Sequence, residues 1–223
     1  MKKLLALILA MIMLVSFAGC GGGNKKAFEA SKAAYDNIDA AYEIVEEFGS
    51  NIYEAWRMGI HEKDEILNDG VEYLASELSL TEDELRLGVA YTMSGIFDQD
   101  WGTMSDEEKN TVADSADYIF ELMEDELFSF CVMVVSNSYV VNGKADEVQV
   151  LLDTAKTQMK ELSEKYSDYE HYPNLKGYYT TTSSFFDFCQ NPTGSFEQVK
   201  DTINDYKNEA RDYISDLDYI FEE

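Results

Sequence analysis

The sequence predicts an all-α fold, an antiparallel bundle of five to seven helices behind an N-terminal signal segment. Three observations support this prediction. Apolar residues recur at steps of three and four over long stretches, polar helix-start patterns precede several of these stretches, and β-favouring runs bounded by turns are scarce. Proline, which would break helices, occurs only at positions 173 and 192. With 45% hydrophobic residues, the chain of 223 residues has enough apolar side chains for a core.

The first helices are expected in the N-terminal half of the chain. Apolar residues with the helical period predict a long helix over residues 27 to about 60, in which Gly49 marks a possible kink or break. A second helical stretch covers residues 71–78. Thr81 and Glu84 then form a capping-box pattern, which predicts the start of a third helix.

A single long helix is expected from a second capping box, at Ser105 and Glu108, through residue 141. Its later half, residues 127–141, is apolar nearly all round, which favours the buried centre of a bundle over a short membrane segment. The valines and tyrosine of that half also have β character. The glycine at 143 predicts its end.

The C-terminal third predicts three more helices. Apolar residues at steps of four and three cover residues 148–166, a polar loop follows at 167–174, and a shorter helix is expected around 178–189. A third capping box, at Ser195 and Gln198, begins the last helix. The tyrosine, threonine and serine cluster at 178–184 either lines a polar pocket for a sugar or peptide or forms one face of the bundle.

Net charge excludes one class of partner. The chain has 17 Lys and Arg against 44 Asp and Glu, a formal net charge of −27. Too little positive surface is available to neutralise a phosphate backbone, so no nucleic acid is expected as a partner. Most of the acidic side chains are expected on solvated helix faces.

The N-terminal residues have the pattern of a bacterial export signal. Lys2 and Lys3 precede an unbroken apolar stretch over residues 4–15, and small residues stand directly before Cys20. The apolar stretch is too short to span a bilayer comfortably. This segment resembles the bacterial lipoprotein signal, in which a peptidase cleaves before a lipidated cysteine.

The resemblance implies that residues 1–19 are removed and that Cys20 carries a diacylglycerol and an acyl chain. Residues 20–26 are then a lipidated tether, and residues 27–223 form a single helical domain. Two or three acyl chains anchor a protein stably, so the expected place is the extracytoplasmic face of the cell membrane. No other cofactor is expected.

One short stretch is similar to a metal-associated motif. Gly59-Ile60-His61-Glu62-Lys63-Asp64 resembles the Gly-x-His-x-x-Glu signature of imelysin-like proteins, which are extracytoplasmic, all-helical and linked to iron uptake. In a continuous helix, His61 and either Asp64 or Glu65 lie one turn apart, so that an imidazole and a carboxylate can share one metal ion. The alternative is a solvent-exposed histidine at a charged helix end.

Two cysteines remain beyond the lipidated one. Cys131 and Cys189 each lie within an apolar run. Outside the cytoplasm they either form a disulfide between two helices or serve as small buried hydrophobic residues. Neither stands in an electropositive sequence context that would activate a catalytic thiol.

The anchor, the helical pattern and the lack of a recognisable catalytic motif favour a non-enzymatic binding or interaction module at the cell envelope. Its partners would be the membrane, through the lipid, and another envelope protein or a small ligand. Two alternatives stay open. One is a small-ligand or metal-binding lipoprotein associated with uptake, and the other is an enzyme acting on envelope polymers.

Overall fold

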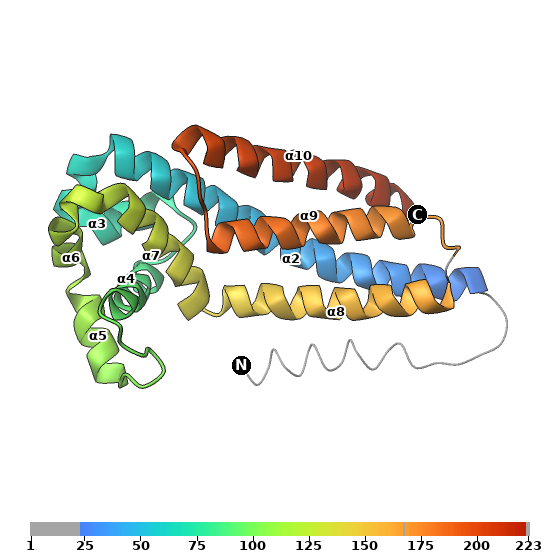
Figure 1. Cartoon of the computed structure of the whole chain (residues 1–223), viewed down its shortest axis with the longest axis horizontal. Helices are drawn as coiled ribbons and strands as arrows, with labels where there is room; N and C mark the ends of the chain where they lie inside the picture. Colours follow the sequence, from blue (N-terminus) through green and yellow to red (C-terminus); the bar gives the residue numbers. More distant parts are fainter. Residues whose placement is uncertain (1–22, 167, 222–223) are drawn as a thin grey trace.

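The computed structural model describes residues 23–166 and 168–221, and within them every regular element is helical (Figure 1). The all-α prediction is therefore confirmed. The described residues form nine α-helices and one 3-10 turn, more than the five to seven helices expected. The signal peptide assigned to residues 1–19 and the lipidation site Cys20 lie outside the described residues.

Four long helices and five shorter ones make up two parts of the molecule. The long helices are α2 (Gly23–His61), α8 (Lys144–Lys165), α9 (Tyr172–Gln190) and α10 (Phe196–Phe221). The shorter ones are α3 (Lys63–Glu77), α4 (Glu82–Ile96), α5 (Asp106–Asp114), α6 (Ala116–Leu122) and α7 (Leu127–Val141). Figure 1 shows the four long helices side by side along the long axis, with the shorter ones gathered at one end. We call residues 63–141 the head.

The first long helix, α2, has the extent that its apolar period predicts, and it begins at Gly23, within the expected tether. Gly49 does not break it. A Cβ at Gly49 would lie 2.4 Å from Cζ of Phe185 on α9, so the glycine allows the two helices to approach closely. The residue at which a kink was expected is therefore the point where α2 packs closely against α9.

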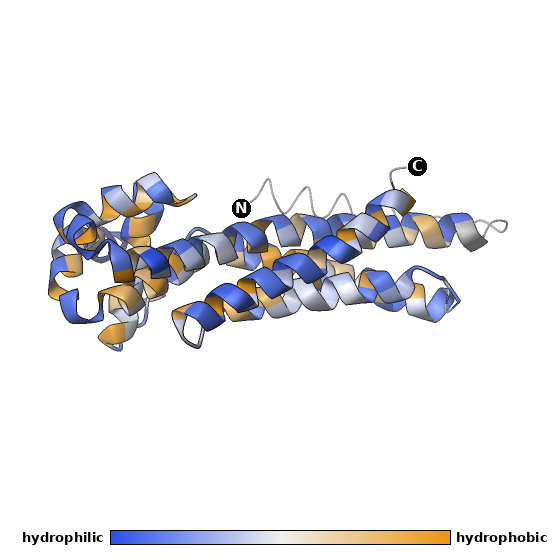
Figure 2. Cartoon of the chain, turned by 90° about the horizontal axis from the view of Figure 1, so that it is seen from above, coloured by the Kyte–Doolittle hydropathy of each residue, from blue (hydrophilic) through white to orange (hydrophobic). Residues whose placement is uncertain are grey.

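Helix α8 returns along α2. Asn37 Nδ2 donates to Gln158 Oε1 at 3.1 Å near one end of the pair, and Lys144 Nζ donates to Glu47 Oε1 at 2.7 Å further along. Figure 2 shows mixed hydrophilic and hydrophobic residues along each long helix, as expected for helices with one face in a core. None of the helices in the described ranges has both the length and the apolar character needed to cross a bilayer.

One hydrophobic core extends through the long helices and the head. Its largest fully buried side chains come from both parts: Phe48, Tyr178 and Phe185 from the long helices, and Phe120, Phe130 and Tyr139 from the head. Helix α7 packs between α4 of the head and the long helix α2, and nine of its side chains are buried. This confirms a buried helix over residues 127–141.

The single helix expected over residues 105–141 is wrong, because the chain leaves the helical path twice. Ser115 ends α5, and Met123 ends α6 ahead of the 3-10 turn at Glu124–Glu126. These breaks allow α6 to turn towards α3, where the Asp117 carboxylate accepts the backbone N–H of Val71 at 3.1 Å. That N–H is free to donate because the helical backbone of α3 is interrupted at the preceding turn.

All three predicted capping boxes form. Glu84 N–H donates to Thr81 Oγ1, while the Thr81 N–H donates to the Glu84 carboxylate at 2.8 Å. Ser105 and Glu108 repeat this arrangement at the start of α5, and Ser195 does so with a glutamine partner before α10. The helix starts are therefore fixed by local sequence.

Candidate functional site

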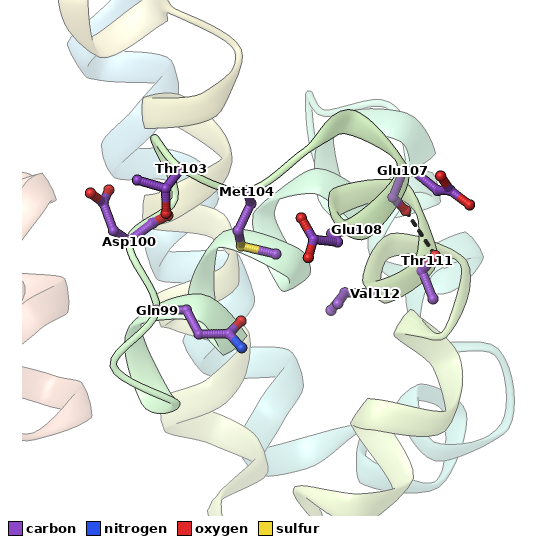
Figure 3. Close-up of a pocket in the computed structure, with 8 residues that line it drawn as sticks. All are labelled: Gln99, Asp100, Thr103, Met104, Glu107, Glu108, Thr111 and Val112. Carbon is purple, nitrogen blue, oxygen red and sulfur yellow. Dashed lines mark hydrogen bonds between the residues drawn. The ribbon is translucent and has the colours of Figure 1, made fainter.

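A first depression, of about 570 Å³, lies between the loop after α4 and helix α5 (Figure 3). Two of its three carboxylates, those of Asp100 and Glu108, accept hydrogen bonds from nearby residues. Glu108 accepts from the backbone N–H and the hydroxyl of Ser105, and these hydrogen bonds hold its pKa below the usual range. Asp100 accepts the Gly102 N–H at 2.9 Å. These two carboxylates therefore shape a turn and a helix start.

The second depression, of about 400 Å³, lies where the head meets the long helices, and we call it the junction groove. Helix α2, the start of α7 and the link between α9 and α10 contribute its walls. Its apolar lining residues are Trp56, Phe128, Val132, Met133 and Pro192. Its polar lining residues are Ser129, Ser136, Asn137, Gln190, Asn191 and Thr193.

The aromatic wall of the junction groove depends on a close approach between α2 and α7. A Cβ at Gly59 would lie only 2.5 Å from Cα of Phe128, so the glycine lets the start of α7 lie against α2. The rings of Trp56 and Phe128 then lie with their centroids 6.1 Å apart. Phe128 is 40% exposed and Met133 39% exposed, which leaves apolar surface uncovered at the groove.

The opposite wall is polar and uncharged. Ser136 Oγ donates to the Cys189 carbonyl at 2.8 Å, which joins α7 to the end of α9. Beyond that point the side chains of Gln190, Asn191 and Thr193 are exposed and make no hydrogen bond within the described part of the chain. Two amides and one hydroxyl are therefore available to a ligand.

Charge is missing from the lining of this groove. None of its eleven lining residues is ionisable, although 27% of the whole chain is charged and the formal net charge is −27. The junction groove is thus a neutral site on a strongly acidic molecule.

A buried polar network fixes the head against the long helices beside this groove. The Tyr139 hydroxyl of α7 donates to Glu47 at 2.7 Å and accepts from Asn51 Nδ2 at 3.0 Å. Lys144 also donates to Glu47, and the Tyr139 ring stacks on Phe48 with centroids 4.0 Å apart. Burial, followed by the hydrogen bond to Glu47, raises the pKa of Tyr139, so its hydroxyl keeps its proton.

The residues proposed for a metal site do not share a helix. His61 is the last residue of α2, the backbone at Glu62 is non-helical, and Asp64 and Glu65 lie in the first turn of α3. The continuous helix on which the expected one-turn spacing depends is therefore interrupted. His61 is exposed, and its ring lies edge-on to Phe196 with centroids 6.1 Å apart. Among the described residues, no group of three His, Cys, Asp or Glu side chains is placed to hold one ion.

Glu62, between these residues, has a structural role that the sequence did not reveal. It accepts hydrogen bonds from Arg57 on α2 and from the Tyr73 hydroxyl on α3, the latter at 2.8 Å. These two hydrogen bonds, Arg57 first, lower the pKa of Glu62. The carboxylate therefore joins the two helices across the break.

Cys131 and Cys189 are free thiols, and both are buried. Burial raises the pKa of Cys131 to about 12, and it also raises that of Cys189. Of the two alternatives from the sequence, the structure has the small buried hydrophobic residues rather than the disulfide. Neither thiol is poised to act as a thiolate nucleophile.

The hydroxyl cluster at 178–184 contributes no residue to either of the two depressions described above. It lies on α9, where Tyr178, Thr181 and Thr182 face the core. The Tyr178 hydroxyl donates to Asp39 at 2.9 Å, and Thr182 Oγ1 is buried without a hydrogen-bond partner in the described structure. The cluster therefore forms a bundle face.

In the sequence, Trp56 falls within the helix expected over residues 27 to about 60, and residues 190–193 follow the helix expected around 178–189, so neither segment indicated the groove that they line together. No local pattern connects the two segments, because contact with α7 brings them together. A scan against protein-family models, a search of curated proteins and a search of solved structures each found no match to this chain.

Proposed function

We propose that this chain is a lipid-anchored module on the extracytoplasmic face of a bacterial membrane, and that it acts by binding and not by catalysis. The resemblance of residues 1–20 to a lipoprotein signal supports the anchor at Cys20. In this proposal the four long helices form an antiparallel bundle that serves as a stalk, and the head carries the binding surface.

One observation carries the proposal: a single continuous helix leads from the anchor position to the head. Helix α2 begins three residues after Cys20 and has 39 residues, which corresponds to a length of about 58 Å at 1.5 Å per residue. Figure 1 shows the head at the end of α2 that is remote from Gly23. A lipid at Cys20 would thus hold the head well away from the bilayer surface.

The chemistry of the described side chains supports binding. Both thiols are buried with raised pKa values, which leaves them unsuited to nucleophilic catalysis. The junction groove combines an aromatic wall with unused amide and hydroxyl groups, a combination suited to holding a ligand. A net charge of −27 also keeps a tethered module soluble beside anionic membranes.

Membrane fractionation with mass spectrometry of the N-terminus tests the anchor. The parent chain should appear in the membrane fraction with an acylated Cys20 as its first residue, whereas Cys20→Ala should accumulate as precursor or shed protein. Cys131→Ala, which removes a buried thiol, is the matched control and should be acylated normally. An acylated, membrane-bound Cys20→Ala product, or parent chain recovered from cytosol with Met1 and no acyl mass, would refute the anchor.

The stalk is tested separately by energy transfer to labelled lipid headgroups. A cysteine label at Tyr219, which is 76% exposed near the end of α10, should transfer efficiently because it lies at the membrane end. A label at exposed Glu107 in the head should transfer weakly. The two native thiols are buried and should stay unlabelled. Equal transfer from both positions would contradict a stalk that stands away from the bilayer.

A further inference from the structure

We propose that the junction groove binds an uncharged sugar that carries acetamido groups, as a short stretch of an envelope glycan would. This inference rests on the proposed binding function and gives it a ligand class. It is built on the shape, the lining chemistry and the charge of the groove.

The size and position of the groove suit a small ligand. Its volume of about 400 Å³ lies within the range of ligand sites, which is about 300–1,000 Å³. It also lies between helices, where the head meets the long helices, and spaces between packed helices are a common place for such sites. Two contacts hold the walls of the groove in place without a ligand. The Ser136 to Cys189 hydrogen bond joins α7 to the end of α9, and the contact of Gly59 with Phe128 joins α2 to α7.

The aromatic wall matches the apolar face of a sugar ring. Pyranose rings present C–H groups on their faces, and these pack against aromatic side chains. Phe128 is partly uncovered and supplies the ring that a sugar can reach, and the neighbouring Trp56, which is 7% exposed, packs behind it. Met133 beside them is equally uncovered, and its flexible thioether can pack against the methyl group of an acetamide.

The polar wall matches the other groups of such a sugar. Gln190 and Asn191 each offer an amide with donor and acceptor atoms, and Thr193 offers a hydroxyl. A sugar with hydroxyl and acetamido groups needs both donors and acceptors. Because these three side chains make no hydrogen bond within the described residues, a ligand would not have to displace an internal partner.

Charge decides against other ligand classes. An anionic ligand would find no cation in the groove and would be repelled by a molecule of net charge −27. A basic peptide would find no carboxylate there and would prefer the acidic helix faces. An uncharged ligand is not repelled by the acidic surface and needs no charged partner in the groove.

The experiment uses the full chain in lipid nanodiscs and follows the fluorescence of Trp56. The chain has two tryptophans, so Trp101→Phe leaves Trp56 as the only indole and keeps an aromatic ring against Tyr91. Titration with tri-N-acetylchitotriose should give a saturable emission change. Its dissociation constant should stay within twofold between about 0.05 and 0.5 M salt, because no charge takes part.

Three substitutions in this background test the site. Met133→Glu places a charge in the groove and should weaken binding at least tenfold, whereas Val150→Glu on α8 should leave it unchanged. These positions are matched, since Met133 is 39% and Val150 40% exposed. Asn191→Ala, on an exposed link where misfolding is not expected, should weaken binding severalfold. Circular dichroism verifies that each variant is helical.

The inference is overturned by the absence of a saturable emission change, or by affinity that is unchanged in both folded Met133→Glu and Asn191→Ala. An affinity that falls steeply with salt would also overturn it. So would a saturable emission change with an uncharged proline-rich peptide and none with the sugar. A failed titration would leave the lipid anchor untouched, because fractionation tests the anchor independently.

Discussion

Alanine at two glycines of one helix, α4, should change stability in opposite directions. Gly88 is buried against α7, and a Cβ there would lie 2.1 Å from Ser138 Oγ and 2.7 Å from the Val134 carbonyl oxygen. The second contact is with backbone and cannot be relieved by a side-chain rotation. Gly95 is exposed, and a Cβ there meets nothing within 4 Å in the described structure.

The magnitudes follow from two opposing effects. Overpacking costs about 1–3 kcal/mol, and replacing a helical glycine by alanine returns about 0.5–1 kcal/mol. Gly88→Ala should therefore lower the free energy of unfolding by about 1–2 kcal/mol, and Gly95→Ala should raise it by up to about 1 kcal/mol. For a chain of this size, each kcal/mol corresponds to about 2–4 °C in Tm.

Thermal and urea unfolding followed by circular dichroism would measure both changes. The double variant Gly88→Ala, Ser138→Ala should recover part of the loss, because it removes the hydroxyl contact and leaves the Val134 carbonyl in place. If the two single alanine variants had equal stability, the packing of α4 against α7 would be wrong. Full recovery in the double variant would show that the backbone contact costs nothing.

Three further predictions concern polar groups. Tyr139→Phe should lower the urea midpoint, at a cost of about 1–3 kcal/mol, because it removes the hydroxyl that pairs with two side chains of α2. Asp39→Asn should stabilise the chain at neutral pH. Burial raises the pKa of Asp39; the hydrogen bond from Tyr178 opposes this and neighbouring carboxylates add to it, so the charged carboxylate destabilises the folded chain. The advantage should be complete above the raised pKa and should vanish as the pH of the unfolding experiments falls to the ordinary value of 3.8. Thr81→Ala should cost about 1 kcal/mol in the same assay through loss of a capping box, whereas the exposed, non-capping Thr103→Ala should cost less.

Local sequence determined the parts of the fold that were predicted. The extents of α2 and α8 follow from the apolar period of each segment, and the starts of α4, α5 and α10 follow from capping boxes of four residues. These signals require no knowledge of the remaining chain. Hence the all-α class and most helix starts could be predicted from residues alone.

Tertiary contacts determined the parts that were not predicted. A glycine such as Gly49 is typical of a helix break, yet α2 continues through it. Its missing Cβ leaves room for the Phe185 ring of α9. The end of α2 was expected near residue 60, but the contacts that join α2 to α3 there were not. Glu62 accepts hydrogen bonds from Arg57 on α2 and from Tyr73 on the next helix. The residue pattern of a single helix shows neither the contact at Gly49 nor the one at Glu62, because each involves a side chain from another helix.

The candidate site was missed for the same reason. Trp56, Phe128 and Asn191 stand far apart in the sequence, and each belongs to a segment with an ordinary structural explanation. Only the contact of α7 with α2 and α9 makes them neighbours. By contrast, the residues that looked functional in sequence, from His61 to Glu65, are separated by the helix break.

The lining of the junction groove comes partly from the head and partly from the long helices, so binding should stabilise the contact between these two parts. A ligand at 100 times its dissociation constant adds about 2.7 kcal/mol to the free energy of unfolding, or roughly 5–11 °C in Tm for a chain of this size. Tri-N-acetylchitotriose should raise the Tm of the parent chain and of Val150→Glu by this amount. In Met133→Glu, a tenfold weaker affinity leaves about 1.4 kcal/mol of stabilisation, so its Tm should rise by about half as much or less. Tyr139→Phe, which contacts no ligand, should weaken the affinity measured with Trp56, because its lost hydrogen bonds let the head shift against α2. Equal affinity in Tyr139→Phe and the parent chain would show that the groove keeps its shape without this network.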